Sequence, residues 1–221
     1  MLLGVYRGSV CTGLNLLGAA LSLFIARFAY PHVTEWIAAH EVWMEYLVYF
    51  SEGSSHIPTA MMEYARADVT TLTAEQVLQV VESSGFPAPF DQVLLNNIAD
   101  KVYAGQYNTL FDYFNQTVAD YSLNTISFVL TFGFTYIVSS LLIVLIDKTF
   151  TFPLLRACDS VVGGLLGAAR AFVWMMVLVT MVPLVMNMLQ ISLITEMVEG
   201  SLLLDYFYPD NWFFGWIHAV V

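Results

Sequence analysis

The sequence predicts an all-α integral membrane protein with about three transmembrane helices and an outer helical segment. The first observation is composition, since 58% of the 221 residues are hydrophobic and only 11% are charged, against about 25% charged in a soluble domain. The second is three uncharged runs, each long enough to cross a hydrocarbon core of about 30 Å. The third is a set of capping and turn signals between the first two runs, which predicts short helices there.

Residues 1–31 are predicted to form the first membrane span. The 19 residues between Arg7 and Arg27 carry no charge, and as a helix they extend roughly 28 Å. The alternative is a cleaved signal peptide. The apolar run is long for a signal peptide, and Arg27 replaces the small residues of a cleavage site, so a retained span is favoured.

Residues 32–125 are predicted to form an extracytoplasmic helical region. Its first part, residues 32–50, has apolar side chains at helical spacing. Trp36, Trp43 and Tyr46 there are of the kind that lies at a membrane interface.

Capping signals predict further helices in this region. Thr73 and Gln76 form a capping box, and Gly85 is a suitable stop, which predicts a helix over about 74–83. Two more helices are expected, one over 91–104 closed by Gly105 and one from 107 to about 122.

Residues 126–189 are predicted to hold two membrane spans joined by a cytoplasmic or re-entrant segment. The second span covers 126–146, and the third follows Arg170, with Pro183 as a kink. One straight helix over 159–189 would be roughly 46 Å long, well over the core thickness. Residues 159–169 are therefore expected at the cytoplasmic side.

The tail, residues 190–221, is rich in aromatic side chains but is interrupted by Asp205 and Asp210. This pattern suits a segment lying on the membrane interface better than one crossing the membrane.

One helix face in the third-span region carries the candidate site. Asp159, Gly163, Gly167 and Arg170 fall at roughly 0°, 40°, 80° and 20° around a helix, so they share a face. The Gly-x-x-x-Gly spacing allows close approach of another helix within lipid. The same spacing arises by chance in apolar helices, so the two charged residues beside it strengthen the interpretation.

The distribution of charge predicts the topology. Lys148, Arg156 and Arg170 lie between the second and third spans, whereas residues 32–125 hold twelve acidic and two basic residues. The positive-inside rule then places residue 1 and residues 148–170 inside, and residues 32–125 and the tail outside. Arg7 and Arg170 could have no role beyond this one, as ordinary positive charges on the cytoplasmic side. The net charge of −11 argues against a nucleic-acid partner.

Residues that could support catalysis or metal binding are sparse. Cys11 and Cys158 each lie in or beside an apolar run, where packing is a better interpretation than a disulfide or zinc site. His40-Glu41 resembles the start of a zinc-protease motif, but Met44 stands where the second histidine belongs. The sequence therefore predicts a non-enzymatic protein with no cofactor.

A transporter or channel subunit is the main alternative. In that interpretation Asp159 and Arg170 line a polar path at a broken helix. The spans hold few ionisable groups, and three spans would make a pore only by oligomerising.

Several short motifs resemble those of one known family, the colicin V production protein (CvpA) family of bacterial inner-membrane proteins. The motifs lie in residues 4–31 and 126–189. They are Tyr6-Arg7-Gly8, Leu16-Leu17-Gly18, Ala26, Leu-Ile-Asp147-Lys148, Leu154-Leu155 and Asp159-x-x-x-Gly163-x-x-x-Gly167-x-x-Arg170.

The chain departs from the family pattern in two ways. The family has Asp-Arg and Arg-Gly in the last motif, where this chain has Ser160 and Ala171. Members also carry a hydrophobic helix before the Arg-Gly of residues 7–8, for which only six residues are present here. Either the start is truncated or the protein has one span fewer.

The resemblance implies an inner-membrane location and a link to colicin V production, toxin biosynthesis and envelope maintenance, with no established reaction. The expected partners are the lipid bilayer and either a second copy or another membrane protein. The residues expected to pack helices or anchor boundaries are Arg7, Gly8, Asp159, Gly163, Gly167 and Arg170.

Overall fold

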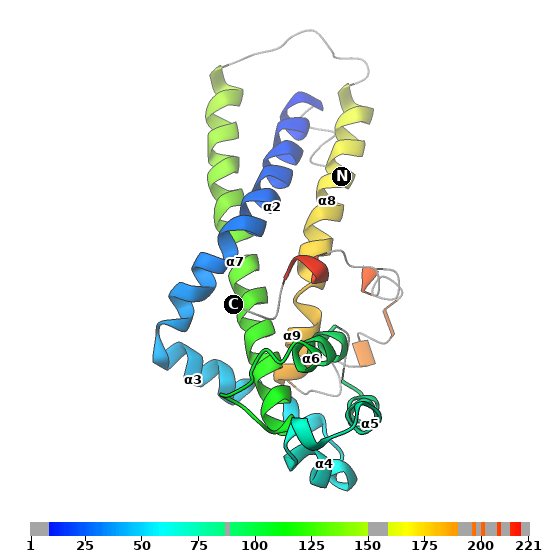
Figure 1. Cartoon of the computed structure of the whole chain (residues 1–221). Helices are drawn as coiled ribbons and strands as arrows, with labels where there is room; N and C mark the ends of the chain where they lie inside the picture. The colour runs from blue at the N-terminus through cyan, green and yellow to red at the C-terminus, as the bar shows by residue number, and fades with distance from the viewer. Residues whose placement is uncertain are drawn as a thin grey trace. The chain divides into compact units, whose positions relative to one another are not determined.

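A computed structural model describes residues 9–86, 89–149, 159–189, 196–197, 200–201, 207–208 and 213–217, without the side chains of residues 146–149, 159–160 and 189. The chain divides into two compact units. The first unit contains residues up to 33 together with 127–179, and the second contains 34–126 and 180–221. The regular elements of the described part are all helices (Figure 1), which confirms the predicted all-α class.

Three helical stretches are long and apolar enough to cross a membrane. They are Ser9–Ala38, Leu110–Leu145 and Val161–Met188. This confirms the three predicted spans, and the chain is a membrane protein. The helices that make up these stretches are α2 (Ser9–Ala38), α7 (Leu110–Thr149), α8 (Asp159–Val179) and α9 (Val182–Leu189).

Helix α2 continues past the point where the sequence predicts its end. Pro31 lies inside it, although proline removes one backbone hydrogen bond. Thr34, one turn later, is fully buried and donates a hydrogen bond to Asn124 Oδ1 at 3.1 Å. This buried contact favours continuing the helix, and α2 extends to Ala38.

Helix α7 joins two elements that the sequence predicts separately. The expected helix over 107–122 and the second span over 126–146 form one helix of 40 residues, roughly 60 Å long. No glycine or proline lies between them. Ser122, Asn124 and Thr125 are buried, so packing overrides their weak intrinsic preference for the helix.

The third predicted span is broken at its C-terminal end. Helix α8 ends at Val179, and α9 begins at Val182 after a turn. Pro183 lies in the first turn of α9, where its missing N–H has no intrahelical partner to lose. The predicted kink is thus a helix break, and α8 alone is roughly 31 Å long, which matches the hydrocarbon core.

The second unit is built from short helices. Besides α9 it contains α3 (Glu41–Phe50), η1 (Gly53–His56), η2 (Thr59–Met61), α4 (Met62–Arg66), η3 (Val69–Thr71), α5 (Ala74–Ser84), α6 (Phe90–Ala99) and η4 (Phe214–Trp216). The predicted helix over 74–83 is confirmed as α5. Both capping-box hydrogen bonds form between Thr73 and Gln76, and Gly85 ends the helix at φ +58°.

Helix α6 is shorter than the sequence predicts. It ends at Ala99 rather than at residue 104, because Lys101 adopts a left-handed backbone with φ +52°, which no α-helix can continue. Turns follow, including Gly105 at φ +89°.

Aromatic rings form the core of the second unit. Phe90 and Phe114 are fully buried, and the ring of Phe86 lies 5.3 Å from the first and 5.2 Å from the second. Phe90 also meets Tyr121 edge to face at 5.2 Å. These contacts hold α6 against the N-terminal half of α7.

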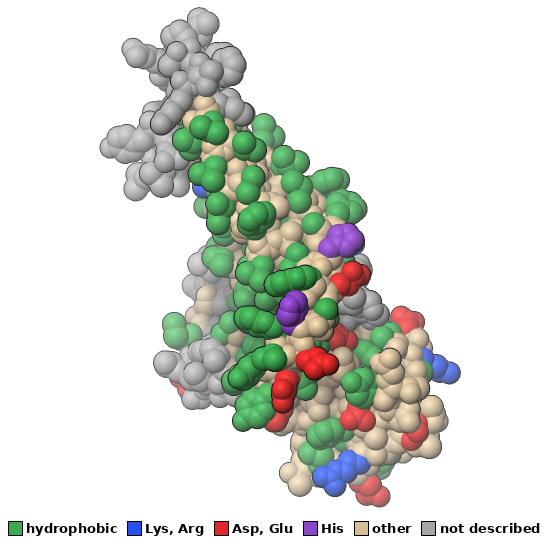
Figure 2. All heavy atoms as spheres, turned by 90° about the vertical axis from the view of Figure 1, so that its left-hand side faces the viewer, with side chains coloured by type: hydrophobic (Ala, Val, Ile, Leu, Met, Phe, Trp, Pro, Cys, Tyr) green, Lys and Arg blue, Asp and Glu red, His purple; other side chains and the backbone are tan. Residues whose placement is uncertain are grey.

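Helix α3 exposes most of its aromatic side chains. Leu47 is its only buried residue, whereas Trp43 is 67% exposed and Tyr49 is 70% exposed. Figure 2, which faces this side of the chain, shows extensive hydrophobic side chains with acidic and histidine side chains among them. An exposed surface of this kind suits a membrane interface, so the location predicted from Trp36, Trp43 and Tyr46 stays a prediction.

Candidate functional site

A seam of small hydroxyl side chains joins α2 to α7 in the first unit. Ser22 and Ser139 place their Oγ atoms 3.3 Å apart, and the Thr135 Oγ1 atom lies 3.4 Å from the backbone carbonyl oxygen of Ser22. Ser22 and Thr135 also donate to carbonyls one turn earlier in their own helices, at 2.7 Å each. Such pairing satisfies hydroxyl groups inside a membrane helix and links neighbouring helices.

Gly18 marks the close approach of the same two helices. A Cβ atom placed on Gly18 would lie 2.8 Å from Ile143 Cδ1 and 3.6 Å from Ser139 Cβ. By contrast, a Cβ on Gly133 of α7 would meet nothing within 4 Å. Only glycine therefore fits at position 18 without a shift of its neighbour.

The residues of the predicted α8 face are only partly described. Gly163 is buried and Gly167 and Arg170 are partly buried, whereas the side chain of Asp159 and all of Arg7 and Gly8 lie outside the described residues. The burial of Gly163 within one chain means that the chain's own residues cover that part of the face.

Arg170 lies among aromatic rings. It donates a hydrogen bond to the Tyr136 hydroxyl, and its guanidinium carbon lies 5.3 Å from the centre of the Tyr136 ring. Trp174 packs edge to face against Tyr136 at 4.9 Å and against Phe132 at 5.0 Å.

This arrangement gives a cation inside an apolar helix a partner from its own chain. Arg170 lies within a stretch that is long and apolar enough to cross a membrane, where an unpaired charge would be costly. The hydrogen bond and the ring face of Tyr136 offset part of that cost. The sequence singled out Arg170 but not Tyr136, because the two residues lie 34 positions apart.

Side chains that can bind metal ions are scattered over the part of the chain that the structure describes. No three His, Cys, Asp or Glu side chains among them are grouped to hold a metal ion.

The second unit contains a buried polar network that the sequence did not predict. The Tyr103 hydroxyl donates to Asp120 Oδ2 at 2.8 Å and accepts from Asn97 Nδ2 at 3.3 Å. Asn97 also donates to Thr117 Oγ1 at 3.1 Å, and Gln116 donates to Asp120 Oδ1 at 2.9 Å. The network ties α6 and the turn after it to α7.

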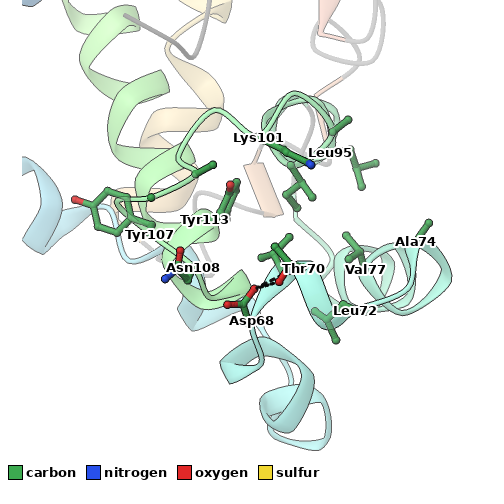
Figure 3. Close-up of a pocket in the computed structure, with 15 residues that line it drawn as sticks. Asp68, Thr70, Leu72, Ala74, Val77, Leu95, Lys101, Tyr107, Asn108 and Tyr113 are labelled. Atoms are coloured by element: carbon green, nitrogen blue, oxygen red, sulfur yellow. Dashed lines mark hydrogen bonds between the residues drawn. The ribbon is translucent and has the colours of Figure 1, made fainter.

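The second unit also contains a pocket of about 440 Å³, which we call the Lys101 pocket (Figure 3). Its apolar wall comes from η3, α5 and α6 and consists of Val69, Leu72, Val77, Leu95 and Ile98. Side chains with polar groups also line it, namely Asp68, Thr70, Lys101, Tyr107, Asn108 and Tyr113. A pocket of this size with an apolar wall and a few polar groups is typical of small-molecule sites.

One family comparison gives a match. Residues 102–209 match the family model described as colicin V production protein. The matched region includes α7, α8 and α9 with the whole Asp159 to Arg170 motif. It does not include residues 4–31, where the first part of the sequence resemblance lies. No curated protein and no solved structure matches the chain.

Proposed function

The chain belongs to the colicin V production protein family through residues 102–209, and from this premise we propose that it is a non-enzymatic protein of the bacterial inner membrane. It serves colicin V production and envelope maintenance through helix packing or oligomerisation in the bilayer. Residues 32–125 lie outside the cytoplasm, as the charge distribution predicts.

The observation that carries this proposal is the internal pairing of polar groups in the first unit. The Ser22 and Ser139 hydroxyls meet each other, and Arg170 is bound to Tyr136. Groups that are engaged in holding helices together are not placed to act on a substrate. This supports a packing role over a catalytic one.

The close approach at Gly18 offers the sharpest test. A Gly18→Leu side chain would have to displace Ile143, whereas Gly133→Leu places the same side chain where a Cβ meets open space. In a strain lacking the chromosomal copy, we expect the wild-type chain and Gly133→Leu to restore colicin V release. Gly18→Leu should restore at most a tenth of it at equal membrane abundance.

Equal restoration by both variants would contradict a role for this packing. Gly163→Leu extends the test to α8, where we expect weaker assembly, read as a smaller particle in mild detergent. An unchanged particle size in Gly163→Leu would count against self-association through the glycine face.

A transporter or channel subunit remains the second candidate, because Arg170 is a partly buried cation within an apolar helix, where charged residues often mark a solute path. Solute or ion flux into proteoliposomes that falls in Arg170→Met, with assembly intact, would favour it. Flux equal to that of empty liposomes would reject it.

A further inference from the structure

The Tyr113 hydroxyl is a polar group of the Lys101 pocket without a partner. Tyr113 is 3% exposed, and within the described part of the chain its hydroxyl makes no hydrogen bond. Figure 3 shows Tyr113 among the lining side chains, between Lys101 and the Asp68–Thr70 turn. The hydroxyl is not among the buried side-chain atoms that lack a hydrogen-bond partner, so it is open to water and available to a ligand in the pocket.

Two opposite charges line the same pocket and do not pair with each other. The Lys101 ammonium has no hydrogen-bond or ion-pair partner among the described residues. Asp68 accepts two hydrogen bonds at Oδ1, from the Thr70 hydroxyl at 2.6 Å and the Thr70 N–H at 2.8 Å. These bonds fix the carboxylate in place and hold the pKa of Asp68 below its usual value.

The backbone of Lys101 is held in a conformation that lysine rarely adopts. Its φ of +52° lies in the left-handed region, which glycine or asparagine would occupy at lower cost. This conformation closes the C-terminus of α6, where the Val102 N–H donates to the Asn97 carbonyl at 3.0 Å. It also places a cation at the edge of an apolar cavity.

The charges around the pocket limit the ligand class. Residues 32–125 carry twelve acidic and two basic residues, and their combined field disfavours a free anion. A cation alone would leave Lys101 unpaired. A molecule with both charges meets Lys101 and Asp68 together, and its apolar body fits the wall formed by Val77 and Leu95.

We propose that the Lys101 pocket binds a small apolar zwitterion, an aliphatic amino acid or dipeptide, whose carboxylate meets Lys101 and Tyr113 and whose ammonium meets Asp68. The apolar side chain of the ligand lies against the aliphatic wall. This site is separate from the packing seam of the first unit.

Calorimetric titration of the full chain in mild detergent tests the proposal, with leucyl-leucine as the probe. N-acetyl-leucyl-leucine lacks the ammonium, and leucyl-leucine amide lacks the carboxylate. We expect each analogue to bind about tenfold or more weakly than the zwitterion, since each loses a charge-assisted hydrogen bond.

Single substitutions test each proposed contact between the ligand and the pocket. Lys101→Asn tolerates the left-handed backbone and should lower the affinity for leucyl-leucine about tenfold without changing that for the amide. Asp68→Asn keeps a side-chain oxygen that can accept from Thr70. This variant should bind leucyl-leucine no more tightly than N-acetyl-leucyl-leucine. Arg66→Met is the matched control, because Arg66 is the other cation of residues 32–125 and does not line the pocket.

Tyr113→Phe separates binding from folding. The ring keeps its edge-to-face contact with Tyr103 at 5.1 Å, so the melting temperature without ligand should stay equal or rise while the affinity falls several-fold. The proposal is overturned if leucyl-leucine does not bind. It is also overturned if the acetylated analogue binds as tightly as the zwitterion, or if Lys101→Asn and Tyr113→Phe leave the affinity unchanged.

Discussion

At the scale of single residues, Tyr103 and Gly53 show how the second unit depends on tertiary contacts. Tyr103 has its hydroxyl in the network with Asn97 and Asp120. Gly53 lies where a Cβ atom would come 2.6 Å from the backbone oxygen of Phe114. Neither role is visible in the sequence, because Asp120 is 17 residues from Tyr103 and Phe114 belongs to a different element from Gly53.

Tyr103→Phe should destabilise the second unit at neutral pH by about 1–3 kcal/mol, since Asp120 loses a buried donor. Burial, and then the charge of Asp120, raise the pKa of Tyr103 above its ordinary value. As the pH rises, the Tyr103 hydroxyl therefore ionises at a lower pH in the unfolded chain than in the folded one. The free energy of unfolding of the wild type falls as the pH rises above about 10.

This alkaline loss should be smaller in Tyr103→Phe. Urea unfolding in detergent between pH 7 and pH 11 measures it, with the exposed Tyr107→Phe as the control. Parallel pH profiles for wild type and Tyr103→Phe would show that Tyr103 does not carry the effect.

Gly53→Ala should lower stability by about 1–3 kcal/mol, because the added methyl group meets backbone rather than a movable side chain. Thr59→Ala, at an exposed position nearby, is the matched control and should change stability by less than about 0.5 kcal/mol. Thermal unfolding compares the two, and equal melting temperatures would refute the close contact.

At the scale of elements, helix ends are set locally and helix continuity is not. Helix α5 begins at the Thr73–Gln76 capping box and stops at Gly85, as the sequence predicts. Helix α7 instead runs through the predicted boundary at residues 122–126. A cap needs only its own residues, whereas the continuation of α7 depends on the burial of Asn124 and Thr125.

Thr73→Ala should destabilise α5 by about 1 kcal/mol, since it removes the hydroxyl that accepts from the Gln76 N–H at 3.3 Å. Amide hydrogen exchange in the first turn of α5 should quicken about fivefold. Gln79→Ala, at an exposed position of the same helix, should leave exchange unchanged. Unaltered protection in Thr73→Ala would show that packing alone fixes this helix end.

At the scale of the whole molecule, three membrane-crossing stretches determine which regions share a side. They are separated by residues 39–109 and by residues 146–160. If all three stretches cross the membrane, residue 1 and the tail lie on opposite sides. From the charge distribution we expect residue 1 on the cytoplasmic side.

Single cysteines at positions 83, 160 and 201, in a chain lacking Cys11 and Cys158, test this topology in intact cells. We expect a membrane-impermeant thiol reagent to label positions 83 and 201 but not position 160. Position 83 is exposed in α5, so its labelling reports sidedness rather than burial. Protection at 201 with labelling at 83 would require an odd number of crossings between them, and therefore one span more or fewer than the two that lie there.

Local properties of the sequence determined the all-α class, the three spans and the caps of α5. An uncharged run of membrane length and a capping box act through neighbouring residues, so they can be read without knowing the fold. The Asp159 to Arg170 motif was recognisable for the same reason, and it lies within the family match at residues 102–209.

Tertiary structure alone decided the partner of Arg170, the Tyr103 network and the Lys101 pocket. Arg170 and Tyr136 are 34 residues apart, and the pocket joins residues from Asp68 to Tyr113. Contacts at such separations depend on how whole helices pack. That packing is set by the summed burial of many side chains rather than by any single motif.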